Sequence, residues 1–168
     1  MKKLALILFL VLFFTASLYA DEDILIADFE GAGYKGWSIQ GGAFRNAPMD
    51  KKLAAEKGFS QFVGRGLASS RDLNEWPKNQ GRITSPKFKI KRKYINFLVG
   101  GGNHAWRTCV NLVIERSIEK IEKIRSSSGY NNEKMVWVTW DVSDIIRETV
   151  SIEVMDNCEE YAWSFYQC

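Results

Sequence analysis

Apolar residues recur at every second position in much of this chain, and that period is the strongest limit on its fold. Val150, Ile152 and Val154 alternate with other residues. The same alternation marks segments 94–99, 110–114 and 136–140. A period of two places successive side chains on opposite faces of a strand, so these segments predict half-buried β-strands. Further strands are predicted at 24–29, 37–40 and 82–90, the last at a sheet edge or a bulge because it contains Pro86.

Glycine-rich and serine-rich breaks separate these strands, whereas helical patterns are scarce. The breaks include 31–33, 41–42, 64–66, 100–103 and 126–129. Segments 51–57 and 141–147 can each form a short helical turn, too short for a crossover between parallel strands. Short strands joined by turns predict an all-β fold, an antiparallel β-sandwich such as a jelly roll.

The first 20 residues have the layout of a secretory signal peptide. Lys2 and Lys3 precede an uninterrupted apolar run at 4–14, and small residues lead to a predicted cleavage site after Ala20. The apolar run is shorter than the about 20 residues that cross a bilayer as a helix. We therefore expect an exported protein, periplasmic or extracellular, with one mature module at 21–168 and no membrane contact after cleavage.

The predicted mature chain is short and nearly neutral. Removal of the leader leaves 148 of the 168 residues, and the formal net charge falls from +3 to +1. So small a charge does not suit a protein that neutralises nucleic-acid phosphates, so no nucleic-acid partner is expected. The length also excludes large catalytic scaffolds such as the ~250-residue α/β barrel.

Three cysteines follow the leader: Cys109, Cys158 and Cys168. An odd number leaves at least one thiol unpaired and excludes a dense disulfide framework. Cys109 lies in a strand-like run and is expected to be a buried, inert thiol. A bridge between Cys158 and Cys168 would close a terminal loop, but spacing alone does not establish it.

Several short motifs follow one another between residues 28 and 156. They read DFEG at 28–31, GW at 36–37, GRGLASS at 64–70, GRITSPKF at 81–88, YINFLVGGGNH at 94–104, TCVNL at 108–112 and TWDVS at 139–143. In this order and spacing they resemble the N-terminal β-sandwich module of bacterial levanases and fructan β-fructosidases of glycoside hydrolase family 32. The resemblance implies a galactose-binding-like sandwich that accompanies a fructan-cleaving catalytic domain and helps it hold polysaccharide.

The chain departs from this family in two ways. The similar modules continue into a last strand of the type G-H-I-N-V-D-x-I, whereas this chain ends at 162–168 with AWSFYQC. We therefore expect the module to lack its last strand, through natural shortness or a frameshift, and to leave an edge exposed. The catalytic propeller, with its W-M-N-D-P-N, R-D-P and E-C motifs, has no counterpart, so no catalytic residue is carried over.

Metal and cofactor chemistry finds weak support in the sequence. Asp28 and Glu30 are the candidate ligands for calcium, which related sandwiches often hold, because a hard cation prefers carboxylate oxygens. They share one strand face, so they do not face each other as the two carboxyls of a glycosidase do. His104 is the only histidine, and with three scattered cysteines it makes no zinc pattern. No cofactor is expected, with calcium as the exception to be tested.

Candidate sugar contacts come from aromatic residues in loops, since flat rings stack on sugars while polar side chains fix hydroxyls. Trp37 and Trp140 are expected to be packed in the core. Trp76 and Trp106 lie in loop contexts where burial is less expected, and Tyr130 is a weaker third candidate. The predicted ligand-binding residues are Trp76, Asn103, His104, Trp106, Arg107 and Tyr130.

The sequence therefore predicts an exported, non-catalytic β-sandwich module that binds a fructan or β-fructoside, with a catalytic glycosidase domain as its further partner. One alternative is a fragment of a longer fructan β-fructosidase whose catalytic part is missing. Another is a module that only packs against a partner and binds no sugar.

Overall fold

The computed structural model describes residues 22–44, 47–71, 80–117 and 120–158. Its elements in chain order are β1 (Ser38–Gly41), β2 (Met49–Asp50), α1 (Lys51–Glu56), β3 (Gly66–Leu67), β4 (Gly81–Thr84), β5 (Phe88–Lys89), β6 (Tyr94–Gly101), β7 (Thr108–Ser117), β8 (Lys120–Ser127), β9 (Asn132–Asp141), the 3-10 helix η1 (Ser143–Ile145) and β10 (Thr149–Asp156). In these residues no helix is long and apolar enough to cross a membrane. The apolar run at 4–14 lies outside them.

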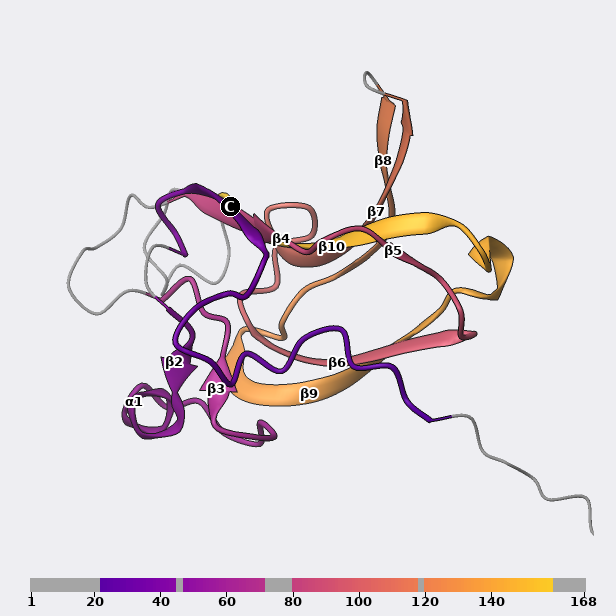
Figure 1. Ribbon diagram of the computed structural model, residues 1–168. Helices are drawn as coiled ribbons and strands as arrows, with labels where there is room; N and C mark the ends of the chain where they lie inside the picture. The colour runs from indigo at the N-terminus through magenta and orange to yellow at the C-terminus, as the bar shows by residue number, and fades with distance from the viewer. Residues whose placement is uncertain (1–21, 45–46, 72–79, 118–119, 159–168) are drawn as a thin grey trace, which may run out of the picture.

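The larger sheet has six strands, with β10 near its centre (Figure 1). Its order is β1-β4-β10-β7-β8, β5 also pairs with β10, and all pairs are antiparallel. Ile152 of β10 stands opposite Leu112 of β7, and both side chains are buried. The alternation in the sequence thus turns one apolar face of each strand toward a common core.

A second sheet, formed by β6 and β9, covers that apolar face (Figure 1). Ile95, Val99 and Trp140 are buried in one cluster with residues of β7 and β10. The rings of Phe97 and Trp140 meet edge to face with centroids 4.6 Å apart. Two antiparallel sheets packed through their apolar faces make a β-sandwich, which confirms the predicted fold class.

The tryptophans predicted to be packed are packed. Trp140 is buried, and its indole Nε1 donates a hydrogen bond to Ser127 Oγ at 2.9 Å. Trp37 is half-buried and lies against both main core clusters, with its ring 5.2 Å from that of Phe29. Both rings therefore contribute to the core.

A small third layer packs on the other face of β9. The cluster of Ala54, Leu67 and Met135 joins α1 and β3 to β9, on the side opposite to Trp140. The helix begins where Asp50 Oδ1 accepts a hydrogen bond from the Leu53 N–H at 2.8 Å. This confirms the short helix predicted at 51–57, and η1 occupies the other predicted helical segment.

The cysteines are partly as expected. Cys109 is buried, and its thiol donates to Asn111 Oδ1 at 3.3 Å. Cys158 is disulfide-bonded, and its partner lies outside the described residues. The pairing of Cys158 with Cys168 stays a prediction.

The strand predicted at 24–29 is absent, so that prediction is wrong. Residues 22–30 run along β6, yet they form no strand pairing in the described part of the chain (Figure 1). Phe29 has a φ of 54°, a left-handed conformation that does not fit a strand. A strand needs a neighbouring backbone to complete its hydrogen bonds, and an apolar pattern cannot supply one.

Two other strand assignments change. The segment 82–90 is divided into β4 and β5 by Pro86, which agrees with the predicted edge or bulge. The long strand β8 was not predicted, because Ile124 is an extra residue between the partners of Leu112 and Val113 and breaks the alternation of β8. Ile121 of the same strand is exposed.

The carboxylate of Glu30 fastens the N-terminal segment to the loop before β3. It accepts hydrogen bonds from the Arg65 N–H (2.6 Å), the Gly66 N–H (3.2 Å) and Arg65 Nε (3.0 Å). The bond from the Arg65 N–H is the main cause that lowers the pKa of Glu30 from its ordinary 4.5. Gly64 has a φ of 84°, and a Cβ there would collide with Glu30 Oε1. The backbone N–H groups of the glycine turn at 64–66 therefore form the binding site for this carboxylate.

Glu30→Gln should destabilise the fold at neutral pH, and the loss should shrink in acid. The folded state lowers the pKa of Glu30, so its contribution is present above the unfolded value of 4.5 and is lost as the pH falls through the folded pKa. Thermal unfolding from about pH 7 to pH 3 measures the difference. Glu56→Gln, at an exposed glutamate of α1, is the control. A Glu30→Gln loss that is the same across this range would contradict the prediction.

Candidate functional site

Most of the predicted sugar contacts gather at one end of the sandwich, on two loops. Residues 102–107 connect β6 to β7, and residues 128–131 connect β8 to β9. The first loop carries Asn103, His104, Trp106 and Arg107, and the second carries Tyr130. We call these two segments the aromatic loops. Trp76 lies outside the described residues.

The backbone holds the two aromatic loops together. The Asn103 N–H donates a hydrogen bond to Asn131 Oδ1 at 2.7 Å. Gly129 is buried so closely against Gly101 that a Cβ on Gly129 would collide with the Gly101 carbonyl. Gly101 itself has a φ of 100°, which favours glycine. The glycine run at 100–102 therefore serves loop packing and does not cradle a phosphate.

Trp106 has an unusual backbone conformation for a bulky residue. Its φ is 69°, and its side chain is 52% exposed. The turn around it is closed by the Arg107 and Thr108 N–H groups, which donate to the His104 carbonyl at 3.0 and 2.9 Å. The Arg107 carbonyl accepts from the Asn157 N–H at 2.8 Å. The loop thus holds an indole ring toward solvent in a left-handed conformation that costs about 1–3 kcal/mol.

The aromatic loops also carry groups that can hydrogen-bond a ligand. Tyr130 is 64% exposed, Asn103 and Arg107 are exposed, and His104 is half-buried against Gly102. Asp156 is the carboxylate beside this end, and its Oδ1 accepts from Thr108 Oγ1 at 3.3 Å and from the Cys158 N–H at 3.2 Å. Aromatic faces with amide, imidazole and guanidinium groups suit the binding of a polyhydroxylated ligand.

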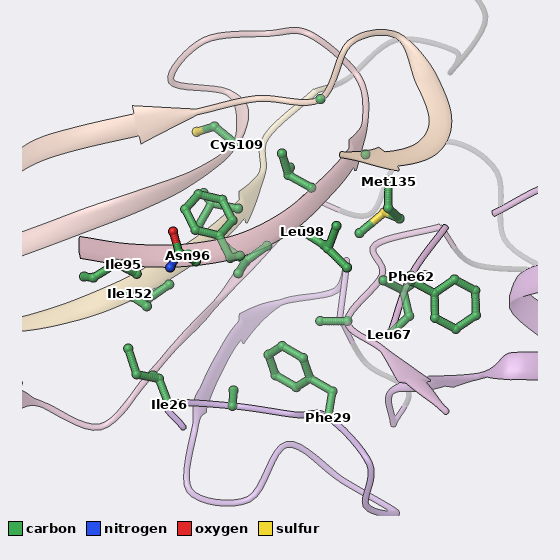
Figure 2. Close-up of a pocket in the computed structure, with 18 of the residues that line it drawn as sticks. Ile26, Phe29, Phe62, Leu67, Ile95, Asn96, Leu98, Cys109, Met135 and Ile152 are labelled. Atoms are coloured by element: carbon green, nitrogen blue, oxygen red, sulfur yellow. The ribbon is translucent and has the colours of Figure 1, made fainter. Parts of the chain in front are cut away.

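A cavity of about 1600 Å³ opens between the two sheets beside β6, and the sequence did not predict it. Figure 2 shows Ile26 and Phe29 of the N-terminal segment on one side of it and Ile95 and Leu98 of β6 on another. Of the predicted sugar contacts among the described residues, only His104 lines it. Its largely apolar wall differs in chemistry from the aromatic loops.

The candidate calcium ligands have hydrogen-bond partners within the protein. Glu30 is bound by Arg65 and Gly66, and Asp28 Oδ1 accepts from the Glu30 N–H at 3.1 Å. Among the described residues no three His, Cys, Asp or Glu side chains gather in a way that could hold a metal ion. Calcium binding stays a prediction without support from this geometry.

Gly129→Ala should lower the stability of the fold, because the new methyl group meets backbone atoms of Gly101 that cannot move aside cheaply. We expect a loss of about 1–3 kcal/mol, measured by chemical or thermal unfolding. Gly33→Ala is the control, since a Cβ at Gly33 meets no atom within 4 Å. Equal stability of the two variants would show that the aromatic loops do not depend on this contact.

The chain is similar to a curated protein of Aspergillus rugulosus described as "Putative glycosyl hydrolase ecdE", with 31% identity over 143 residues. The match covers 83% of this chain but 19% of the relative, so the chain spans about a fifth of the relative's length. No family model matches the chain, and no solved structure matches it. The similarity thus relates most of this module to one part of a much longer protein that is described as a glycosyl hydrolase.

Proposed function

We propose that this chain is an exported, non-catalytic module that binds carbohydrate through the aromatic loops, with a fructan or β-fructoside as its ligand. The similarity to a described glycosyl hydrolase supports the carbohydrate part of the proposal. The motif resemblance to modules of fructan-cleaving enzymes supports the choice of fructan. Lys2 and Lys3 followed by the apolar run at 4–14 support export.

The observation that carries the proposal is the conformation of Trp106. A tryptophan with a φ of 69° is strained, and Trp106 belongs to none of the core clusters of the described residues. An indole held toward solvent can instead stack on the apolar face of a sugar ring, while Asn103 and Arg107 donate to its hydroxyls.

The proposed role is binding and not catalysis. Glycoside hydrolysis needs two carboxyl groups about 5 to 9.5 Å apart across the scissile bond. Beside the aromatic loops, the described chain offers Asp156, which is engaged by Thr108 and the Cys158 N–H, and Glu133, which pairs with Arg71 at 3.0 Å. If the chain is a fragment of a longer fructan β-fructosidase, the module keeps the same binding role within that enzyme.

Trp106→Ala should weaken fructan binding by about tenfold or more, because it removes the stacking surface. Isothermal titration calorimetry with levan and inulin measures the affinity, and cellulose oligosaccharides test the choice of sugar. Trp137→Ala is the matched control, since Trp137 is a 64% exposed tryptophan on β9. No heat of binding with either fructan would refute the fructan proposal, and equal effects of the two variants would refute the assigned site.

Trp106→Gly should separate stability from binding. Glycine adopts a positive φ without strain, so we expect the melting temperature to stay the same or to rise. Fructan affinity should fall as in Trp106→Ala. Differential scanning fluorimetry and calorimetry on the same preparation give both values. A marked loss of stability in this variant would instead show that the indole is a structural side chain.

A further inference from the structure

One part of the cavity lies between the N-terminal segment and β6. Its wall includes two continuous stretches of chain, residues 23–30 of the N-terminal segment and residues 88–102, which contain the whole of β6. The two stretches run in the same direction side by side (Figure 1). We call the space between residues 23–30 and β6 the strand slot.

Among the described residues, no backbone pairing joins residues 22–30 to β6 or occupies the edge of β6 opposite to β9. In the described part of the chain β6 pairs only with β9, and residues 22–30 form no strand. At one end the segment before β6 is tied to the N-terminal segment, because Arg92 donates to the Glu22 carbonyl at 3.2 Å. At the other end Glu30 fastens the N-terminal segment to Arg65 and Gly66 at β3. Open N–H and C=O groups on facing edges are a template for an added strand.

The side chains around the strand slot favour a polypeptide over a sugar. Of the large apolar residues that are exposed, five line this cavity: Ile24, Leu25, Val63, Tyr94 and Trp137. Three of them are aliphatic, and aliphatic side chains offer no stacking face to a saccharide. A contiguous exposed apolar patch of this kind usually marks a protein interface.

The charges at the two ends give the slot a direction. At the start of β6 the three cations Lys91, Arg92 and Lys93 outnumber the one carboxylate, Asp23. Asp28 and Asp156 line the other end, where Glu30 is bound by Arg65 and Glu133 is paired with Arg71. An inserted strand that runs antiparallel to both flanking segments would place its C-terminal part at the basic end. An inserted strand that complements the slot therefore carries acidic residues near its own C-terminus and basic residues near its own N-terminus.

We propose that the strand slot binds an extended strand from another polypeptide, antiparallel to β6 and to residues 23–30, with apolar side chains at alternate positions. The inserted strand would complete hydrogen-bonded ladders on both sides and bury the exposed aliphatic side chains. The charges at its two ends and the exposed aliphatic side chains are the features that such a partner strand would complement. The proposal does not depend on sugar binding, because, of the sugar candidates among the described residues, only His104 also lines the cavity.

The test uses the full chain and a fluorescent peptide of alternating valine and threonine, about as long as β6, with lysine at its N-terminus and glutamate at its C-terminus. Fluorescence anisotropy should show saturable binding. A peptide with the two end charges exchanged should bind more weakly. Backbone N-methylation at alternate residues should abolish binding, because it removes ladder hydrogen bonds while it keeps the apolar side chains. Equal binding of the methylated peptide would overturn the proposal.

Two protein variants locate the peptide. Leu25→Asp puts a charge at a 74% exposed residue of the slot, and Ile121→Asp does the same at a 65% exposed residue of β8 that does not line it. We expect Leu25→Asp to weaken peptide binding by about tenfold and Ile121→Asp to leave it unchanged. Trp106→Ala should also leave it unchanged, which separates this proposal from the sugar site.

Hydrogen exchange identifies the occupant. Amides of residues 22–30, and those β6 amides that point away from β9, should exchange fast in the free chain and become protected with the peptide. Protection of these same amides in the free monomer would show that the slot is already filled by this chain itself, and protection that appears only in a dimer would assign it to a second copy. Either result, or no peptide binding at all, would overturn the proposal.

Discussion

The position of β10 between β4 and β7 is the constraint on which the larger sheet depends. One face of β10 buries Val150 and Ile152 in the core between the sheets. Its other face carries Glu153, which is buried although it is charged. Glu153 meets Arg82 of β4 at 3.1 Å, Asn111 of β7 at 3.0 Å and Lys123 of β8 at 3.2 Å. A buried carboxylate needs such partners, so an arrangement that separated these four strands would leave a buried charge unpaired. The contacts of Glu153 on one face of β10 thus favour this strand order, while Val150 and Ile152 on the other face contribute buried apolar surface.

The sequence was sufficient for the sandwich because its central strands carry an apolar residue at every second position. The assignments at 94–99, 110–114 and 150–154 follow from this period, since each strand turns those residues toward the core between the sheets. The same reasoning failed at 24–29, where the pattern is apolar but no neighbouring strand completes the ladder. It also missed β8, because a bulge shifts the period. Strand formation depends on a partner as well as on a pattern, and only the three-dimensional arrangement shows the partner.

The sequence also predicted part of the candidate site, namely which residues lie in loops. Glycine-rich breaks placed Trp106 and Tyr130 in loops, and the fold brings those loops to one end. The left-handed conformation of Trp106 could not be read from the sequence, because neighbouring residues do not dictate it. The strand slot could not be predicted from the sequence for another reason. Its wall combines Leu25, Val63 and Tyr94, which are far apart in the chain and individually look like ordinary strand or loop residues.

The strand β6 links the two surfaces physically. Its free edge forms one wall of the strand slot, and its C-terminal end continues directly into the loop that carries Trp106. Gly101 at that end packs against Gly129, so the base of both aromatic loops rests on the last residues of β6. A strand bound along the free edge would add hydrogen bonds to β6 and reduce its local opening. The aromatic loops are positioned by the end of β6. A more ordered free edge of β6 would therefore also reduce the conformational entropy that the loops lose when a ligand binds. The two surfaces are therefore chemically distinct but share one structural support.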